Sequence, residues 1–175
     1  MQIAVLTFDG FNELDSFIAA GILNRMKAKG WAAYITAPTE RVTSMNGVTI
    51  ERQRPLEFAA QADAVLIGSG IKTLEIAAAP AMLGLIADVP ACTDLTTKPW
   101  VIEAGVQVLD APFFARGNVA TAGGCLAANY LAAWLIARGA GWSDAAEALH
   151  YVAPVGEKDA WIARARDVVA PFLTV

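Results

Sequence analysis

The stretch MQIAVLTFDGFNELDSFIAAGILNRMKAKGWAAYITAP, residues 1–38, decides the fold class. Its apolar run Gln2–Phe8 is typical of a buried strand. Apolar residues then recur at the spacing of one helix face, at Leu14, Phe17, Ile18, Gly21, Ile22 and Met26. Gly30 indicates the end of that helix, and Trp31–Ala37 is a second apolar run that stops before a proline. The strand–helix–strand order predicts two parallel strands with a right-handed crossover.

The same alternation continues along the chain. Asn46-Gly47, between two stretches that favour strands, predicts a hairpin over residues 41–54. Further predicted strands are Asp63–Ile67, Ala91–Asp94, Val106–Leu109 and Asn118–Thr121, and further predicted helices are 73 to about 85, 99–104, 123–138, one capped by Ser143, and 157–172. We expect a single α/β domain over residues 1–175, with a doubly wound, mostly parallel sheet and helices on both faces.

Composition narrows the class of protein. The chain is 56% hydrophobic and 17% charged, against about 45–50% and about 25% for an average soluble domain. No apolar run reaches the ~20 residues that span a membrane, and the N-terminus lacks the features of a signal peptide. The net charge of −4, without a cluster of Lys and Arg, argues against nucleic acid as a partner. We therefore expect a cytoplasmic protein that binds neither membranes nor nucleic acid, and whose two cysteines are free thiols.

The topology predicts where a site would lie. Ligands of such folds bind outside the carboxyl ends of the strands, which here means residues 9–15, 68–72 and 93–97. Gly68-Ser69-Gly70 follows a predicted strand and precedes a predicted helix, so its backbone N–H groups could face an anion or an oxyanion, or it is simply a tight turn. Thr73 stands where the dinucleotide fingerprint has its third glycine, and there is no Walker loop, so we do not expect a bound nucleotide. We expect no other cofactor either.

Four side chains are candidates for chemistry. Asp15, one turn into the first helix, is either an acid/base group beside an apolar stripe or an acid favoured by the helix dipole. His150, the single histidine, ends a predicted helix, and a Ser–His or Cys–His pair with it stays open. Cys92 lies in a predicted strand and Cys125 near the start of a helix, and both are more typical of packing than of catalysis. No metal site is predicted from one histidine and two scattered cysteines.

Several segments, in order, resemble the ThiJ/PfpI superfamily, whose glutamine-amidotransferase-like members include the Parkinsonism-associated deglycase and isonitrile hydratase. The segments are Ile3–Phe8 with Asp9-Gly10-Phe11 and Glu13-Leu14-Asp15, then 64–70, 91–94, 117–124 and His150-Tyr151-Val152-Ala153-Pro154, the last being similar to the isonitrile hydratase branch. The resemblance implies a flavodoxin-like fold, a homodimer and a small-molecule substrate.

The resemblance also implies a site. Its acid corresponds to Asp15 and its backbone amide hole to Gly70 and Ile71, while Gly68, Thr93 and Asp94 are expected to line a pocket. The family's catalytic cysteine lies on a strand–turn–helix elbow that has no counterpart here, because residues 84–88 lead almost directly into the 91–94 segment.

Loss of that strand and helix would leave a void that close packing does not tolerate. We therefore expect one of three explanations for the missing strand and helix. The neighbouring strands have moved together to fill the space, a dimer partner stabilises the chain, or the sequence omits residues that the whole molecule has. The resemblance favours cysteine-dependent hydration or hydrolysis of a small molecule with Asp15 as proton shuttle. The alternative is a non-catalytic binding or stress-response domain that has lost the nucleophile.

Overall fold

A computed structural model describes residues 1–77 and 89–173 of the chain. By its contacts the chain divides into two compact units, Met1–Thr73 and Leu74–Val175, called here the first and the second unit. The expectation of one domain over residues 1–175 stays a prediction.

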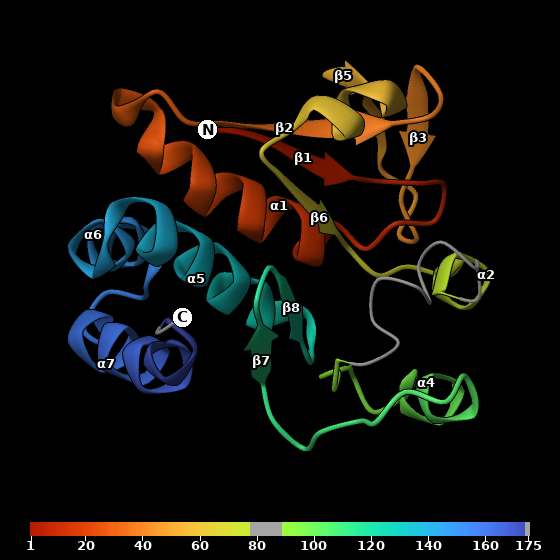
Figure 1. Cartoon of the computed structure of the whole chain (residues 1–175). Coiled ribbons are helices and arrows are strands. Elements are labelled where there is room, and N and C mark those ends of the chain that lie inside the picture. The colour runs from red at the N-terminus through yellow and green to blue at the C-terminus, as the bar shows by residue number, and fades with distance from the viewer. Residues whose placement is uncertain (78–88, 174–175) are drawn as a thin grey trace. The chain divides into compact units, whose positions relative to one another are not determined.

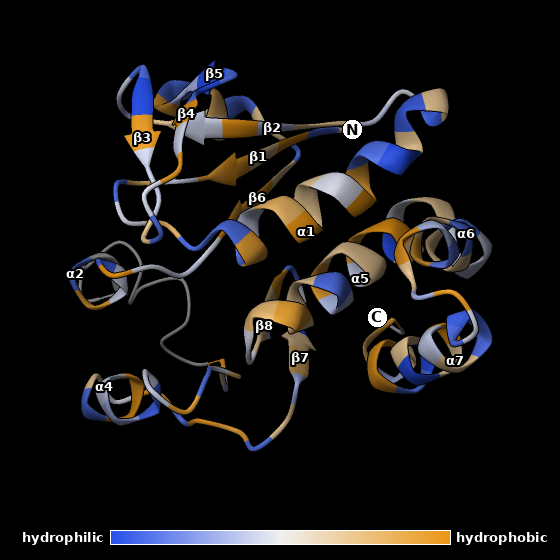
Figure 2. Cartoon of the chain, turned by 180° about the vertical axis from the view of Figure 1, so that it is seen from behind, coloured by the Kyte–Doolittle hydropathy of each residue, from blue (hydrophilic) through white to orange (hydrophobic). Residues whose placement is uncertain are grey.

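A parallel sheet forms the centre of the first unit. Its strands are β1 (Gln2–Leu6), β2 (Ala32–Ala37), β5 (Arg54–Pro55) and β6 (Ala64–Ile67), in the order β5-β2-β1-β6. Every pair in this sheet is parallel. Hydrophobic residues run along β1 and β6 (Figure 2). Those of β1 are buried, as expected for a central strand of an α/β fold, whereas Val65 and Ile67 of β6 are 44% and 36% exposed. The predicted α/β class with a parallel central sheet is confirmed.

The crossover between β1 and β2 is the helix α1 (Glu13–Leu23), which lies along the sheet (Figure 1). A 3-10 helix, Asn24–Lys29, continues it, and Gly30 ends it with a φ of +79°, as predicted. The predicted apolar stripe is only partly the buried face. Ile22 and Leu23 are buried, whereas Leu14 and Phe17 are 52% and 39% exposed.

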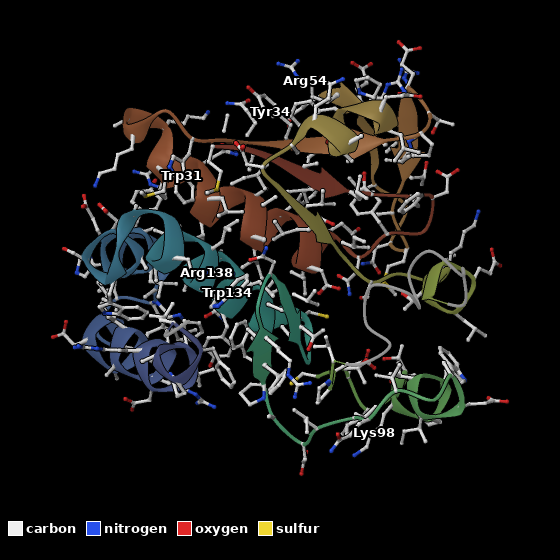
Figure 3. The ribbon with its side chains drawn as sticks, in the orientation of Figure 1. Trp31, Tyr34, Arg54, Lys98, Trp134 and Arg138 are labelled. Atoms are coloured by element: carbon white, nitrogen blue, oxygen red, sulfur yellow. The ribbon has the colours of Figure 1, made fainter. Side chains whose placement is uncertain are left out.

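The predicted hairpin is also confirmed. Strands β3 (Arg41–Thr43) and β4 (Thr49–Glu51) pair antiparallel on either side of the turn that contains Asn46-Gly47. Beyond it, the Arg54 guanidinium lies 4.4 Å from the centre of the Tyr34 ring (Figure 3), and a 3-10 helix, Leu56–Gln61, leads into β6.

The second unit is mostly helical. After the described part of α2 (Thr73–Ala77), its elements are α4 (Lys98–Glu103), β7 (Phe113–Arg116), β8 (Val119–Ala122), the 3-10 helix Cys125–Ala127, α5 (Ala128–Ala140), α6 (Trp142–Val152), α7 (Lys158–Val169) and the 3-10 helix Ala170–Phe172. Ile136, Leu149 and Val169 are fully buried between the last three helices.

Aromatic side chains join the C-terminal end of this unit to α5 and β7. The Trp134 indole N–H donates to the Phe172 carbonyl at 3.2 Å, and the Phe113 ring packs against both side chains. Arg138 stacks on Trp134 and donates to the Gly117 carbonyl at 2.7 Å, which ties α5 to the turn between β7 and β8 (Figure 3).

Several predicted boundaries in this unit are wrong. Ala91–Asp94 and Val106–Leu109 are not strands, because they share a single parallel bridge between Ala91 and Val108. Phe113–Arg116, not predicted, is a strand because it pairs with β8 along its whole length.

Two helices start elsewhere than predicted. The helix expected from Gly123 begins as a 3-10 turn at Cys125, since Gly124 has a φ of +94° that does not fit a helix. The helix expected to be capped by Ser143 starts at Trp142 after Gly141.

The predicted helix from Thr73 begins where expected. The rest of it, and the 84–88 segment taken as the remnant of an elbow helix, lie outside the described residues. None of the helices in residues 1–77 and 89–173 is long and apolar enough to cross a membrane.

Candidate functional site

Three loops of the first unit converge at the carboxyl ends of β1 and β6. They are residues 9–12 after β1, 43–46 in the hairpin and 69–71 after β6. The backbone hydrogen bonds that join them are Asn12 N–H to Ser69 O at 2.8 Å, Ile71 N–H to Gly10 O at 2.9 Å, Gly10 N–H to Thr43 O at 2.6 Å and Met45 N–H to Phe11 O at 2.9 Å. Two of the three loops predicted from topology, residues 9–15 and 68–72, are therefore held in one hydrogen-bonded platform, together with the hairpin loop, which was not predicted to lie at the site. The third, residues 93–97, belongs to the second unit.

Two glycines make this close approach feasible. A Cβ on Gly70 would lie 2.3 Å from the Gly10 oxygen and 2.8 Å from the Phe11 Cα, so only glycine fits without backbone movement. Gly10 has a φ of +81°, and a Cβ there would meet the Ile71 side chain. The Gly-x-Gly sequence at 68–70 thus has a packing reason, as the tight-turn interpretation expected.

Asp15 lies at the centre of the platform. Asn12 caps α1 by accepting the Leu14 N–H at 3.0 Å, which places Asp15 in the first turn of the helix. Its Oδ2 accepts the backbone N–H of Ser69 at 2.9 Å and also a short hydrogen bond from the Ser69 hydroxyl. The half-buried carboxylate is thus tied to the turn after β6. Sequence reasoning placed Asp15 but missed Ser69 as its partner, although Ser69 is the one side chain in the Gly-Ser-Gly turn.

The two amides expected to form an oxyanion hole both donate within the protein. The Gly70 N–H donates to Thr73 Oγ1 at 2.7 Å, and the Ile71 N–H donates to the Gly10 carbonyl at 2.9 Å. An oxyanion would have to displace these acceptors. The Thr73 hydroxyl is the easier one to displace, because it is a side chain that can rotate.

Gly68 lies directly beneath the start of α1. A Cβ there would meet the Asp15 Cβ at 3.3 Å and the Ser16 Oγ at 2.9 Å. Ser16 is 1% exposed, and its Oγ has no hydrogen-bond partner among residues 1–77 and 89–173. Gly68 and Asp15 are therefore neighbours, as the predicted site requires.

A second carboxylate holds the hairpin to the same helix start. Glu13 accepts hydrogen bonds from the Ser44 hydroxyl and, at 2.9 Å, from the Asn46 Nδ2. The hydrogen bond from Ser44 is the main reason that the pKa of Glu13 lies below its ordinary value. Asp9 accepts the Thr43 N–H at 2.9 Å. Glu13 thus joins the hairpin to the first residue of α1.

In the second unit, Thr93 and Asp94 bond within the turn that precedes α4. Asp94 Oδ1 accepts the backbone N–H groups of Thr96 and Thr97 at 2.8 and 3.1 Å, and its Oδ2 accepts the Thr97 hydroxyl at 2.6 Å. The hydroxyls of Thr93 and Thr97 are 2.5 Å apart. These contacts fix the turn that leads into α4. The pocket role expected for Thr93 and Asp94 stays a prediction.

Asp94 gives the stability of the chain a pH dependence. Partial burial alone raises the pKa of Asp94, but the hydrogen bonds from Thr97 and Thr96 outweigh it and leave the pKa below the ordinary 3.8. The ionised form therefore stabilises the fold above that value, and this contribution is lost as the pH falls through the lowered pKa. We expect urea unfolding of the Asp94→Asn variant to lose part of the acid dependence seen in the native chain. Superimposable pH profiles would contradict this assignment.

The two cysteines lie in the second unit in different settings. Cys92 is 4% exposed, and its backbone N–H donates to the Thr121 hydroxyl at 2.9 Å. Burial raises the pKa of the Cys92 thiol, which disfavours the nucleophilic thiolate. Cys125 is half-buried at the first position of the 3-10 turn before α5.

His150 is exposed in the last turn of α6, where its carbonyl accepts the Lys158 Nζ. Within residues 1–77 and 89–173, no three His, Cys, Asp or Glu side chains are grouped so as to hold a metal ion.

Comparison with known proteins shows the fold. No protein-family model matches the chain, and no curated protein matches it. Among solved structures, a ThiJ/PfpI family protein from Pseudomonas syringae is 17% identical with a TM-score of 0.69, over 97% of this chain and 87% of that one. An AraC family transcriptional regulator from Pseudomonas putida is 15% identical with a TM-score of 0.72, over 87% of this chain and 99% of that one.

Drosophila melanogaster DJ-1beta is 19% identical with a TM-score of 0.65, over 86% of this chain and 96% of that one. The chain therefore has the fold of ThiJ/PfpI and DJ-1 proteins, in agreement with the fold that the sequence resemblance implied.

Proposed function

We propose that this chain is a small-molecule-binding domain on a DJ-1-like fold that does not act through a cysteine thiolate. The observation that carries the proposal is the pairing of Asp15 with Ser69. In a cysteine mechanism this carboxylate would exchange a proton with a thiol, whereas here its Oδ2 accepts two hydrogen bonds from one serine. A half-buried carboxylate at the carboxyl ends of parallel strands suits a ligand that presents a hydrogen-bond donor.

Two further observations support a binding role. The Cys92 thiol is buried with a raised pKa, so it is a poor nucleophile. One solved structure of this fold is described as a transcriptional regulator rather than as an enzyme, so the fold itself does not demand catalysis.

Thiol kinetics test the proposal. We expect both cysteines to react slowly with an aromatic disulfide reagent at neutral pH in the folded chain. They should react at the full rate of a free thiol only in denaturant. Cys92→Ser and Cys125→Ser variants assign each phase. A fast phase in the folded chain that Cys125→Ser removes would contradict the proposal.

The second candidate is cysteine-dependent hydration, similar to that of isonitrile hydratase. The observation that favours it is the position of Asp15, which lies at the carboxyl ends of β1 and β6 where a proton shuttle is required. Two results together would establish cysteine-dependent hydration. One is a cysteine that reacts fast in the folded chain, and the other is isonitrile hydration that the Asp15→Asn variant loses. Retained activity in that variant would remove Asp15 from the mechanism.

We also propose that the chain is a homodimer that uses the outer face of α1. Leu14 is 52% exposed and Phe17 39% exposed on this helix. An exposed apolar face of this kind suits contact with a second copy of the chain. Light scattering after gel filtration should give twice the 18.4 kDa chain mass, and Phe17→Glu should give the monomer. A native monomer would overturn this proposal.

A further inference from the structure

The hairpin of the first unit contains an asparagine–glycine pair with a structural role. Asn46 is followed by Gly47, while the other asparagines, Asn12, Asn24, Asn118 and Asn129, are followed by Glu, Arg, Val and Tyr. Gly47 has a φ of +87° and open space around its Cα, and its N–H donates to the Ser44 carbonyl at 3.1 Å. The pair is exposed on the surface of the hairpin turn.

The Asn46 side chain holds the hairpin to α1 through a hydrogen bond to Glu13. This bond, together with the one from Ser44 to Glu13, is called here the latch. The Asn46 Nδ2 donates to Glu13 Oε2 at 2.9 Å, and the Ser44 hydroxyl donates to Oε1 of the same carboxylate. Glu13 is the first residue of the helix that carries Asp15 two positions later. The Asn46 amide and the Ser44 hydroxyl thus both donate from the hairpin to the first residue of the site helix.

We propose that Asn46 is a site of spontaneous deamidation, and that its conversion releases the hairpin from Glu13. The backbone nitrogen of Gly47 attacks the side-chain carbonyl carbon of Asn46, the bond to Nδ2 breaks, and ammonia leaves with the displaced proton. Water then opens the cyclic imide, giving aspartate or isoaspartate at position 46. The sum is amide plus water to carboxylate plus ammonia, with no oxidant or cofactor required. Glycine favours the attack because it has no side chain to hinder its nitrogen.

The product cannot keep the latch. Deamidation removes the N–H donor and puts a second negative charge where Glu13 has its own, so a hydrogen bond is replaced by like-charge repulsion. An isoaspartate also lengthens the backbone of a turn whose register depends on its residue count. The backbone hydrogen bonds from Gly10 to Thr43 and from Met45 to Phe11 join the hairpin to the loop before α1, so we expect the loss of the Glu13 contact to weaken them.

The folded latch also restrains the reaction. The Gly47 N–H is occupied by Ser44, and the Asn46 amide is held by Glu13, so the attack requires the turn to open. We therefore expect Glu13→Ala to speed deamidation at Asn46, and unfolding to speed it further. Because deamidation is irreversible, the contact between the hairpin and the site helix is lost permanently once Asn46 has reacted.

Mass spectrometry of aged protein tests the proposal. The native chain is incubated in mildly alkaline buffer, and the peptide of residues 42–52 is analysed over time beside the same chain in denaturant. We expect this peptide to gain the mass that replacing the amide NH2 by OH adds, and to do so faster than any other asparagine-containing peptide, because only Asn46 is followed by glycine. Asn46→Gln is the matched control, since it keeps an amide near Glu13 but reacts through a less favourable ring.

Hydrogen exchange supplies the second readout. The aged, charge-shifted fraction should exchange the amides of Gly10 and Met45 faster than the fresh protein, while Asn46→Gln incubated alongside should not change. Deamidation at Asn46 in denaturant but not in the folded chain would overturn the proposal. Folded-chain deamidation with unchanged exchange at both amides would overturn the latch.

Discussion

Replacing Gly70 with alanine is expected to destabilise the chain by about 2–4 kcal/mol. The new Cβ would lie 2.3 Å from the Gly10 carbonyl oxygen and 2.8 Å from the Phe11 Cα, both of which belong to backbone that cannot rotate away. Relief requires the loops after β1 and β6 to separate. That movement weakens the hydrogen bonds from Ile71 to Gly10 and from Asn12 to Ser69. Urea unfolding followed by circular dichroism measures the loss.

Gly21→Ala is the matched control for this prediction. Gly21 lies in α1, and a Cβ there meets no atom within 4 Å. Alanine should therefore stabilise the helix by about 0.5–1 kcal/mol, because it restricts the unfolded chain and favours the helix. If Gly70→Ala were as stable as Gly21→Ala, the close approach of the two loops would be wrong.

The first unit was largely predictable because its signals are local. The apolar runs of β1 and β2, the stop at Gly30 and the Asn46-Gly47 turn each identify an element from a few neighbouring residues. Which face of α1 is buried was harder. Leu14 and Phe17 continue the apolar periodicity of Ile22, yet they are exposed. Periodicity shows only that apolar residues share one face of a helix. It does not show whether that face packs in the core or lies on the surface.

The second unit was less predictable because pairing partners decide its elements. Ala91–Asp94 has the composition of a strand but makes one bridge, whereas Phe113–Arg116 becomes a strand through its pairing with β8. At the site, topology placed Asp15 beside Gly68 and Gly70. It could not reveal that Ser69 and Thr73 occupy the carboxylate and the Gly70 amide, since these hydrogen bonds depend on side-chain rotamers.

Replacing Asp15 with alanine is expected to cost about 1–3 kcal/mol of unfolding free energy. The change removes the acceptor of the Ser69 backbone N–H and of the Ser69 hydroxyl, both in a half-buried turn. It also removes an acid from the first turn of α1, where the helix dipole favours negative charge. Asp15→Asn keeps one acceptor oxygen in place, so it should lose less than half as much.

The neighbouring serine separates this effect from simple disturbance of the helix. Ser16 Oγ is buried and has no partner in the described part of the chain, so Ser16→Ala should be neutral or slightly stabilising although it alters the same helical turn. Parallel urea titrations of Asp15→Ala, Asp15→Asn and Ser16→Ala give the comparison. Equal losses for all three would mean that the turn tolerates no change at all. A loss confined to the Asp15 variants, larger for alanine than for asparagine, would mean that the Asp15–Ser69 hydrogen bonds hold the carboxylate at the end of β6. Fixing a polar group there before a ligand arrives is what a binding site on this fold requires.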